Sequence, residues 1–570
     1  MSRVRRKLAL ALLAPLGFLA AVEGIAWAAG VRTPRYVGLE PVADYWVRYD
    51  EPGEPAGYTR AFPRNYKLYP EQLPLFVRDK PANGWRLFAL GESSVQGLPW
   101  EVGCFSDRLR VRLAAMLPDR SIEVVNAGNA GWHAAEIRTL LRECLEHAPD
   151  ALVWMVGHNE SVPQNVLALR DEVESPFLSR LSRAALSLRT AELIRRIAPK
   201  PTKSARTVVF DRLVASEEPC LGPEFPLLQR RYREAVAGAV ADARAAGVPI
   251  LLCTMPRNAH DYAPSGSWFT PAVRDDPERR RKWTEAYDRG CGLLSAGKAQ
   301  DALARFEEAL AIDDAPAKLH FQLGRAHEAL KEGAAARSAY VRALEQEACP
   351  MRARAWVEEA IRQVALETGA PLVDLERMFD SRGKLALAGS ELIADNCHPN
   401  LEGHALIADA LLDELERDVH LPLDRGRDLS TRETEDRLGV TAYRELHSTK
   451  DQALFDVRAV LQSGVPGELA SRVRASCEKV LARDATDWEV MGALGLVDAI
   501  DGDRESAHRR ITEAMKQNGF VRISYLLYAK LEPPWRSAFD RAGIDMAAVE
   551  ANLSDDERMS LTNRLAKVGR

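Results

Sequence analysis

The stretch WRLFALGESSVQG, residues 85–97, decides the fold of this chain. Its first half, from Trp85 to Leu90, is a short apolar run that ends at a glycine, as expected for a buried parallel strand. Gly91 allows a sharp turn, and Ser93 follows where a helix would begin. Ser93 is therefore a candidate nucleophile, although Gly-Glu-Ser-Ser on its own is a common turn sequence.

Further short apolar runs follow along the chain, separated by stretches with helical spacing. We expect strands at 122–125, 151–156, 248–254 and 371–375, and helices at 105–117, 134–147, 230–245, 355–368 and 403–415. Strands that alternate with helices in this way indicate an α/β domain built on a parallel sheet. Sites in such domains form at the carboxyl ends of the strands.

Three more segments carry chemistry at those ends. The loop NAGNAG, residues 126–131, has two glycines that would leave backbone N–H groups facing an oxyanion. The loop GHNE, residues 157–160, places the Asn159 amide where it can donate to the same oxyanion. In DNCHPN, residues 395–400, an acid stands three residues before a histidine, so Asp395 can hold Nδ1–H of His398 and leave Nε2 as a base.

Together these four segments, in this order, resemble the SGNH hydrolase family, also called GDSL esterases. Its motifs are a GDS-like turn, an N-x-G-x-x-G loop, a G-x-N-D loop and a D-x-x-H pair. The resemblance covers about residues 85–253 and 355–415. It implies a three-layer α/β/α, flavodoxin-like fold and no cofactor or metal. It also implies a catalytic triad and an oxyanion hole formed by the Ser93 and Gly131 N–H groups and the Asn159 side chain; the triad residues are Ser93, His398 and Asp395.

The sequence departs from the family pattern at two acids. Glu92 and Glu160 stand where the family usually has aspartates, each longer by one methylene. Ser94 offers a second hydroxyl, but the spacing to Gly97 favours Ser93. In the second motif Gly131 matches the oxyanion glycine better than Gly128. A metal site is a competing interpretation of His158, Glu160, Asp395 and His398, but an asparagine-rich oxyanion hole explains these residues better.

A repeat interrupts the α/β pattern between the fourth and fifth strands. Gly290, Ala302, Phe306 and Ala309 recur at Gly324, Ala336, Tyr340 and Ala343, a shift of 34 residues each time. Small and aromatic residues at this period resemble tetratricopeptide (TPR) repeats, in which small residues let two helices approach closely. A weaker copy lies near Gly495 and Ile511. We expect a helical insert at 263–350 between hydrolase segments 85–262 and 351–418, followed by a C-terminal helical domain at 419–570.

The N-terminus indicates export. Four basic residues precede an apolar run from Leu8 that Glu23 interrupts and that resumes to Val31. Read through to Gly30, the run is about 34 Å long as a helix, enough to span a bilayer. The basic flank predicts the bulk of the chain outside the membrane. We expect residues 1–31 to be a signal anchor, or else a cleaved signal peptide that leaves a secreted or periplasmic protein, and 32–84 to be an irregular linking segment.

Composition excludes several classes of protein. The formal net charge is −5, from 77 basic and 82 acidic residues, which gives no electrostatic case for nucleic acid. The eight cysteines form no CxxC pair and are read mostly as buried thiols, although an even number in an exported protein is compatible with a bridge. The basic amphipathic pattern at 177–197 suits a cover helix, or a lid or membrane-surface helix.

These patterns predict a serine esterase that acts on acyl esters of exported glycans or lipids. An acyltransferase that modifies an exported polysaccharide would use the same residues. An interaction scaffold with an inert hydrolase fold is a third interpretation, because TPR units bind partner proteins. We expect an acyl-ester substrate, a protein partner at the repeats and a membrane contact through the N-terminal helix.

Overall fold

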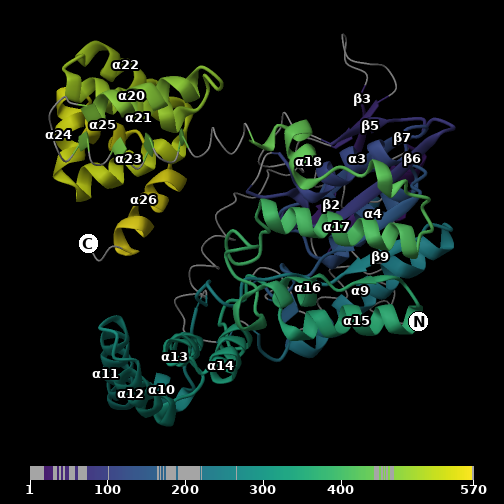
Figure 1. Ribbon diagram of the computed structural model, residues 1–570, viewed down its shortest axis with the longest axis horizontal. Coiled ribbons are helices and arrows are strands. Elements are labelled where there is room, and N and C mark those ends of the chain that lie inside the picture. Colours follow the sequence, from purple (N-terminus) through teal and green to yellow (C-terminus); the bar gives the residue numbers. More distant parts are fainter. Residues whose placement is uncertain are drawn as a thin grey trace, which may run out of the picture. The chain divides into compact units, whose positions relative to one another are not determined.

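A computed structural model of the chain is shown in Figure 1. It describes residues 18, 20–29, parts of 35–61, 74–99, 102–162, scattered positions in 166–190, 219, 221–264, 266–441, scattered positions in 449–461, and 468–567. The chain divides into two compact units, Met1–Leu438 and Gly439–Arg570, which are described separately.

A five-stranded sheet forms the centre of the first unit. Its strands are β6 (Gly84–Gly91), β7 (Ser121–Gly128), β8 (Ala151–Met155), β9 (Ile250–Cys253) and β10 (Leu372–Val373). All pairs are parallel, in the order β10-β9-β8-β6-β7. In this flavodoxin-like order the direction of the strand order reverses between β6 and β8, and sites in such sheets form at the carboxyl ends of the strands at that point. The predicted α/β fold is confirmed.

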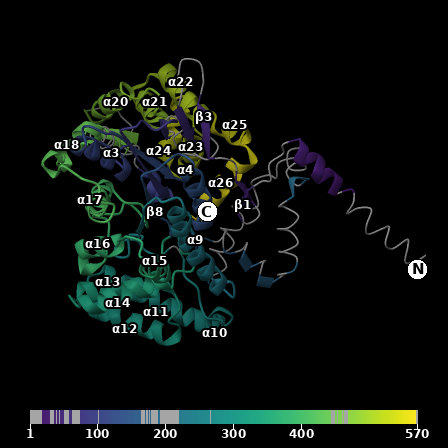
Figure 2. The same ribbon diagram turned by 90° about the vertical axis from the view of Figure 1, so that its right-hand side faces the viewer.

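Helices cover both faces of the sheet. Helices α4 (Ala134–Leu145), α9 (Phe225–Ala245) and α15 (Ala355–Thr368) pack side by side on one face. Helices α3 (Phe105–Met116) and α17 (Leu401–Arg417) pack together on the other, so that β8 lies between the two layers in Figure 2. The strands are apolar because both faces are covered; every side chain of β8 and β9 is buried.

The segment before β6 is more ordered than the sequence indicated. Strands β1 (Arg35–Val37) and β2 (Glu40–Val42) pair, and β3 (Trp46–Tyr49), β4 (Tyr58–Ala61) and β5 (Leu75–Val77) form an antiparallel sheet. Trp46 packs on Phe76 and Phe88 in the main core. The expectation of an irregular segment is wrong here, because strands of three or four residues among prolines and charges are too short to show a period.

Besides α15, five helices lie between β9 and β10 in the described part of the chain. They are α10 (Pro271–Arg274), α11 (Pro277–Ser295), α12 (Ala299–Ile312), α13 (Ala317–Ala329) and α14 (Gly333–Glu345). A Cβ on Gly290 would stand 2.4 Å from the Phe306 ring, and one on Gly324 would stand 2.7 Å from the Tyr340 ring. The glycines of the 34-residue period therefore let α11 approach α12 and α13 approach α14. The resemblance to TPR repeats remains a prediction.

The second unit is helical where the structure describes it. Its helices are α20 (Glu468–Leu481), α21 (Trp488–Asp501), α22 (Arg504–Gln517), α23 (Gly519–Leu531), α24 (Pro533–Arg541), α25 (Met546–Ala551) and α26 (Asp555–Lys567). Residues 419–438 belong to the first unit instead, because α18 (Thr431–Leu438) packs on α3, and Arg112 Nη2 bonds Asp428 at 2.7 Å. The boundary after Leu438 is later than the predicted start at 419.

The predicted anchor lies mostly outside the described residues, as does most of 177–197. Within the described part of the chain, no helix has the length and apolar character needed to cross a bilayer. Residues 20–28 are helical, and the Glu23 carboxylate accepts hydrogen bonds from the Arg189 and Thr190 N–H groups at 2.8 and 3.0 Å.

Candidate active site

The turn after β6 presents Ser93 at the carboxyl edge of the sheet. A Cβ on Gly91 would stand 2.1 Å from Val95 and 2.4 Å from the Met155 carbonyl oxygen, so no larger residue fits. Glu92 is the N-cap of the short helix α2 (Ser93–Gln96), and Gly97 ends it in the left-handed conformation at φ 103°. Ser93 is thus the first helical residue, and its N–H has no acceptor within the helix.

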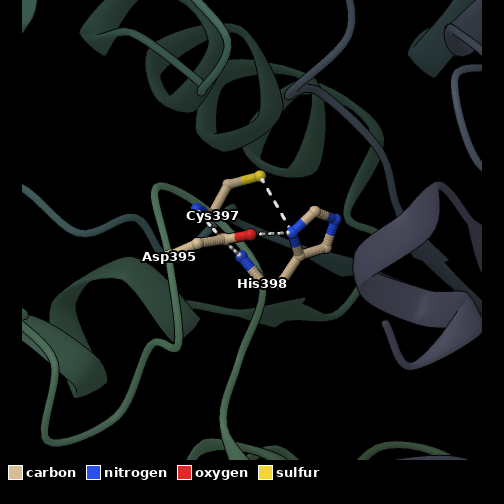
Figure 3. Close-up of side chains that lie close together, drawn as sticks. All are labelled: Asp395, Cys397 and His398. Carbon is tan, nitrogen blue, oxygen red and sulfur yellow. Dashed lines mark hydrogen bonds and ion pairs between the residues drawn. The ribbon is translucent and has the colours of Figure 1, made fainter. Parts of the chain in front are cut away.

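The structure brings Ser93, His398 and Asp395 together although about 300 residues separate the serine from the histidine in sequence. His398 Nε2 lies 2.7 Å from Ser93 Oγ, and His398 Nδ1 lies 2.7 Å from Asp395 Oδ2. Asp395 Oδ1 accepts the N–H groups of Cys397 and His398, both at 2.9 Å, which fixes the loop drawn in Figure 3. A hydrogen-bond chain of this kind can link an acid, a base and a nucleophile.

The carboxyl of Asp395 is held in its ionised form. Burial disfavours the charge, but the hydrogen bonds from the His398 side chain and backbone, together with the charge of His398, outweigh burial and lower the pKa of Asp395 to about 2. An ionised carboxylate at this position can orient the imidazole ring of His398 through Nδ1.

The neighbouring hydroxyl, Ser94, has a different role. Its side chain is buried, and Oγ donates to the Cys397 carbonyl oxygen at 3.3 Å. Ser94 therefore ties the helix α2 turn to the loop that carries His398, while Ser93 faces the base. Of the two hydroxyls, Ser93 Oγ is the one that lies at His398 Nε2, and its role as the nucleophile stays a prediction.

The Gly131 loop lies beside Asn159. Asn159 Nδ2 donates to the Trp132 carbonyl oxygen at 3.0 Å, which holds the amide next to that loop. Gly131 has φ 81°, and its N–H makes no hydrogen bond in the described part of the chain. The Gly128 N–H, in contrast, is occupied by Asn126 Oδ1 at 2.9 Å. Of the two glycines, Gly131 is the one whose N–H can serve an oxyanion.

Two buried carboxyl groups fasten the loops of the site to one another. Glu92 accepts the N–H groups of Gly157, His158 and Asn159 at 3.2, 2.9 and 3.1 Å. Glu160 Oε1 accepts the Ala134 N–H at 2.6 Å, where the Gly131 loop enters α4. The two departures from the family pattern are therefore crosslinks: Glu92 joins the Ser93 turn to the Asn159 loop, and Glu160 joins the Asn159 loop to the Gly131 loop.

Burial disfavours the ionised form of both Glu92 and Glu160. Burial, followed by the negative charge of Glu160, raises the pKa of Glu92 to about 8, against the opposing effect of the backbone N–H donors. Burial likewise raises the pKa of Glu160. The loops of the site are thus held by acids that have no cationic side chain among their described hydrogen-bond partners.

The competing metal interpretation is not supported by the positions of its residues. His158 Nδ1 accepts the Ala353 N–H at 3.0 Å, and Glu160 is engaged at α4. Burial and the charge of His398 lower the pKa of His158 to about 3, so its imidazole is neutral. Among the residues that the structure describes, Asp395, Cys397 and His398 are the group that offers clustered ligand atoms.

The stretch directly after the helical insert, residues 351–353, contacts two loops of the site. Asn396 Nδ2 donates to the Met351 carbonyl oxygen at 2.6 Å, and the Asn396 carbonyl oxygen accepts the Asn258 N–H at 3.0 Å. The neighbouring Ala353 N–H is the donor to His158. Residues 351–353 therefore support both the loop of His398 and the loop of Asn159.

Sequence reasoning missed these supporting residues. It quoted Glu92 and Glu160 as departures and Asn396 as part of a motif, without a role for any of them. The signal available in the sequence was that each of these polar residues stands next to a motif residue. Their hydrogen-bond partners could not be found from the sequence, because they lie far along the chain, as Met351 does from Asn396 and Gly157 does from Glu92.

Comparison with protein-family models and with curated proteins finds no match. Among solved structures, the chain is similar to a GDSL-like lipase from Bacteroides thetaiotaomicron, with 11% identity and a TM-score of 0.26 over 58% of this chain and 88% of that one. A Bacillus subtilis protein shows 13% identity and a TM-score of 0.27 over 59% and 57%. A gut microbial diltiazem-metabolizing enzyme shows 11% identity and a TM-score of 0.26, over 59% of this chain and 48% of that one. Likenesses this weak assign neither a family nor an activity to this chain.

Proposed function

We propose that the protein is a serine esterase that hydrolyses acyl esters through Ser93, His398 and Asp395. The observation that carries the proposal is the unbroken chain of two 2.7 Å contacts from Asp395 Oδ2 through the His398 ring to Ser93 Oγ. A nucleophile within hydrogen-bond reach of a base, which a third group orients, is the arrangement that acyl transfer requires.

The reaction follows from these positions. His398 Nε2 takes the Ser93 proton as Oγ bonds to the acyl carbon, and the carbonyl oxygen becomes an oxyanion. The N–H groups of Ser93 and Gly131 and the amide of Asn159 are the donors for that oxyanion, each worth about 3 kcal/mol where such donors have been removed. The C–O bond to the alcohol then breaks, and His398 returns the proton to it. Water, activated by His398, releases the acid from Ser93.

A panel of p-nitrophenyl acyl esters tests the proposal. Wild type should hydrolyse the short esters, and a fluorophosphonate probe should label it. Ser93→Ala should lose both, whereas Ser94→Ala should keep the label. His398→Ala should cost nearly as much rate as Ser93→Ala, and the double variant little more, because the triad acts as a unit. Labelling that disappears in Ser94→Ala instead, or additive losses in the double variant, would contradict the assignment.

Hydrolysis and transfer share every step up to the acyl-enzyme, so a sugar hydroxyl in place of water would make the same protein an acyltransferase. Mass spectrometry of acylated glycans with and without the protein separates these outcomes. Loss of acyl groups in the presence of the protein supports the esterase, and a gain of acyl groups supports transfer.

We further propose that the protein acts at the cell envelope. The basic flank and apolar run at the N-terminus support this location. Near the end of the run, Phe18, Ile25 and Trp27 are 72%, 69% and 69% exposed, as side chains that contact lipid would be. Activity of a C-terminal reporter that works only in the cytoplasm would contradict this location.

The helical insert is the proposed surface for a protein partner, as its resemblance to TPR repeats implies.

A further inference from the structure

The loop that holds the catalytic pair carries a third side chain, which the proposed reaction does not use. The Cys397 Sγ atom lies 4.0 Å from His398 Nδ1. Sγ, Nδ1 and a carboxylate oxygen of Asp395 all lie within 4.8 Å of one another. Figure 3 shows the three side chains grouped together. The cysteine is in the free thiol form and is 4% exposed, so it is a packed side chain aimed at the histidine rather than a surface thiol.

We propose that Asp395, Cys397 and His398 form an inhibitory site for a soft divalent cation such as Zn²⁺. One thiolate sulfur, one imidazole nitrogen and one carboxylate oxygen are ligands that zinc accepts, with water in the fourth position. Hard cations such as Mg²⁺ prefer oxygen ligands and are not served by this set.

The local geometry allows the cation to enter and bind. The Asp395 side chain is 41% exposed and that of His398 is 18% exposed, so solvent reaches the group from the side of the aspartate. Oδ1 stays bonded to the backbone N–H groups of the loop, which leaves Oδ2 to turn to the cation. Bringing the three atoms to zinc-ligand distances of about 2.0–2.3 Å requires side-chain shifts on the order of 1 Å.

Binding would disable the base without removing any residue. The cation takes the Nδ1 lone pair, the proton that was on Nδ1 resides on Nε2 instead, and the Cys397 thiol releases its proton to solvent. No electrons are transferred. Nε2, which faces Ser93 Oγ at 2.7 Å, then has no lone pair to accept the serine proton. The wrong imidazole tautomer lowers kcat of a serine protease by roughly 10⁴.

Cation binding can be measured without catalysis. Cd²⁺ is the probe, because its thiolate complexes absorb in the ultraviolet, and Ser93→Ala is the background, because it keeps all three ligands. We expect Ser93→Ala to bind Cd²⁺ with a thiolate band that Cys397→Ala removes. Cys291→Ala is the matched control, since Cys291 is more exposed than Cys397 and should leave the band intact. A band that survives Cys397→Ala would overturn the site.

The proposal that the cation inhibits the enzyme rests on the proposed function, and the rate of ester hydrolysis tests it. Zn²⁺ should lower wild-type hydrolysis of p-nitrophenyl acetate by roughly 10²-fold or more, given the cost of the wrong tautomer, and a chelator should restore it. Mg²⁺ should not inhibit. Cys397→Ala, compared with its own metal-free rate, should be insensitive to Zn²⁺. Equal inhibition of this variant would overturn the proposal. If wild type hydrolyses no ester, the proposed function fails, and Cd²⁺ binding to Ser93→Ala still decides the site.

Discussion

The chain contains two groups of helices in which a glycine on one helix faces a bulky side chain on the next. In the insert, Gly290 faces Phe306 and Gly324 faces Tyr340; in the second unit, Gly495 lies where a Cβ would stand 2.8 Å from Ile511. The insert is followed directly by Met351 and Ala353, whose backbone groups contact the loops of the candidate site. The helices after Leu438 belong to a unit of their own.

The difference teaches that close packing within a helical pair and connection to the active site are separate properties. Packing depends on the glycines. The connection depends on the short stretch after α14, where backbone groups meet Asn396 and His158. The second unit has instead a surface hollow of about 450 Å³, lined by residues of α22 and by Ala542. The lining residues on α22 are Arg504, Glu505, His508 and Arg509.

The largest contrast should come from removing each region. Replacing residues 263–350 by a short flexible linker frees Met351 and Ala353, so the loops of His398 and Asn159 lose their support. We expect esterase kcat/KM to fall by roughly 10²-fold or more, because small misplacements of reacting groups are this costly. A chain that stops after Leu438 should keep its rate within a few-fold. Full activity in a folded chain without the insert, verified by circular dichroism, would contradict the connection.

A single side chain should show the same contrast more gently. Asn396→Ala leaves the Met351 carbonyl without its donor and should lower kcat by about 10-fold to 10²-fold, with KM nearly unchanged, because the loop of His398 shifts. The control is Asn518→Ala. Asn518 caps α23 through the Phe520 and Val521 N–H groups, so its loss should cost the second unit about 1 kcal/mol and leave kcat alone. A KM effect alone for Asn396→Ala would indicate a different role.

Overpacking the helical pairs separates stability from activity. Gly324→Ala and Gly495→Ala should each destabilise their own unit by about 1–3 kcal/mol, since each new Cβ meets a neighbour below 3 Å. Scanning calorimetry gives the transition of each unit, and residual activity after heating gives the temperature of inactivation. Only Gly324→Ala should lower that temperature. Equal inactivation by Gly495→Ala would show that the second unit also supports the site.

The smallest expected contrast is in pH. Burial raises the pKa of Glu92 from its ordinary value of 4.5 to about 8 in the folded chain, so the folded state binds more protons than the unfolded state between these pH values. Stability of the first unit should therefore fall as pH rises from about 5 to 8, by on the order of a few °C in transition temperature. Glu92→Gln should remove that part of the slope.

The second unit should show the opposite sign at acid pH. The Ser506 N–H lowers the pKa of Asp503 below 3.8, so its contribution is present above that value and is lost as pH falls through the folded pKa. Calorimetry at a series of acid and neutral pH values measures how the transition temperature of each unit changes with pH, and so checks both predicted directions. A second-unit transition that falls between pH 5 and 8 as steeply as the first would contradict this difference.

Sequence reasoning identified the sheet because its strands are short and mostly apolar, as two covered faces require. It placed Ser93, Asp395 and His398 because those residues sit at fixed offsets from glycines or from each other. It could not find the contact of Asn396 with Met351, which joins residues 45 positions apart through an amide and a carbonyl. It also missed β3 and the burial of Trp46, because that strand has only four residues.

Arg352, which closely follows the insert, bonds the chain that precedes the insert, and this contact has a consequence for the order of folding. The Arg352 side chain is buried and bonds the carbonyl oxygens of Asn258 and Tyr262, and so ties the two ends of the insert together. Strands β9 and β10 must pair across the whole segment 254–371, and closing so long a loop is entropically costly. Helical pairs form from local contacts and therefore quickly. Once the insert has folded and Arg352 has closed its base, the remaining loop is short, so the edge strand and the loop of His398 should be the last parts of the sheet to form.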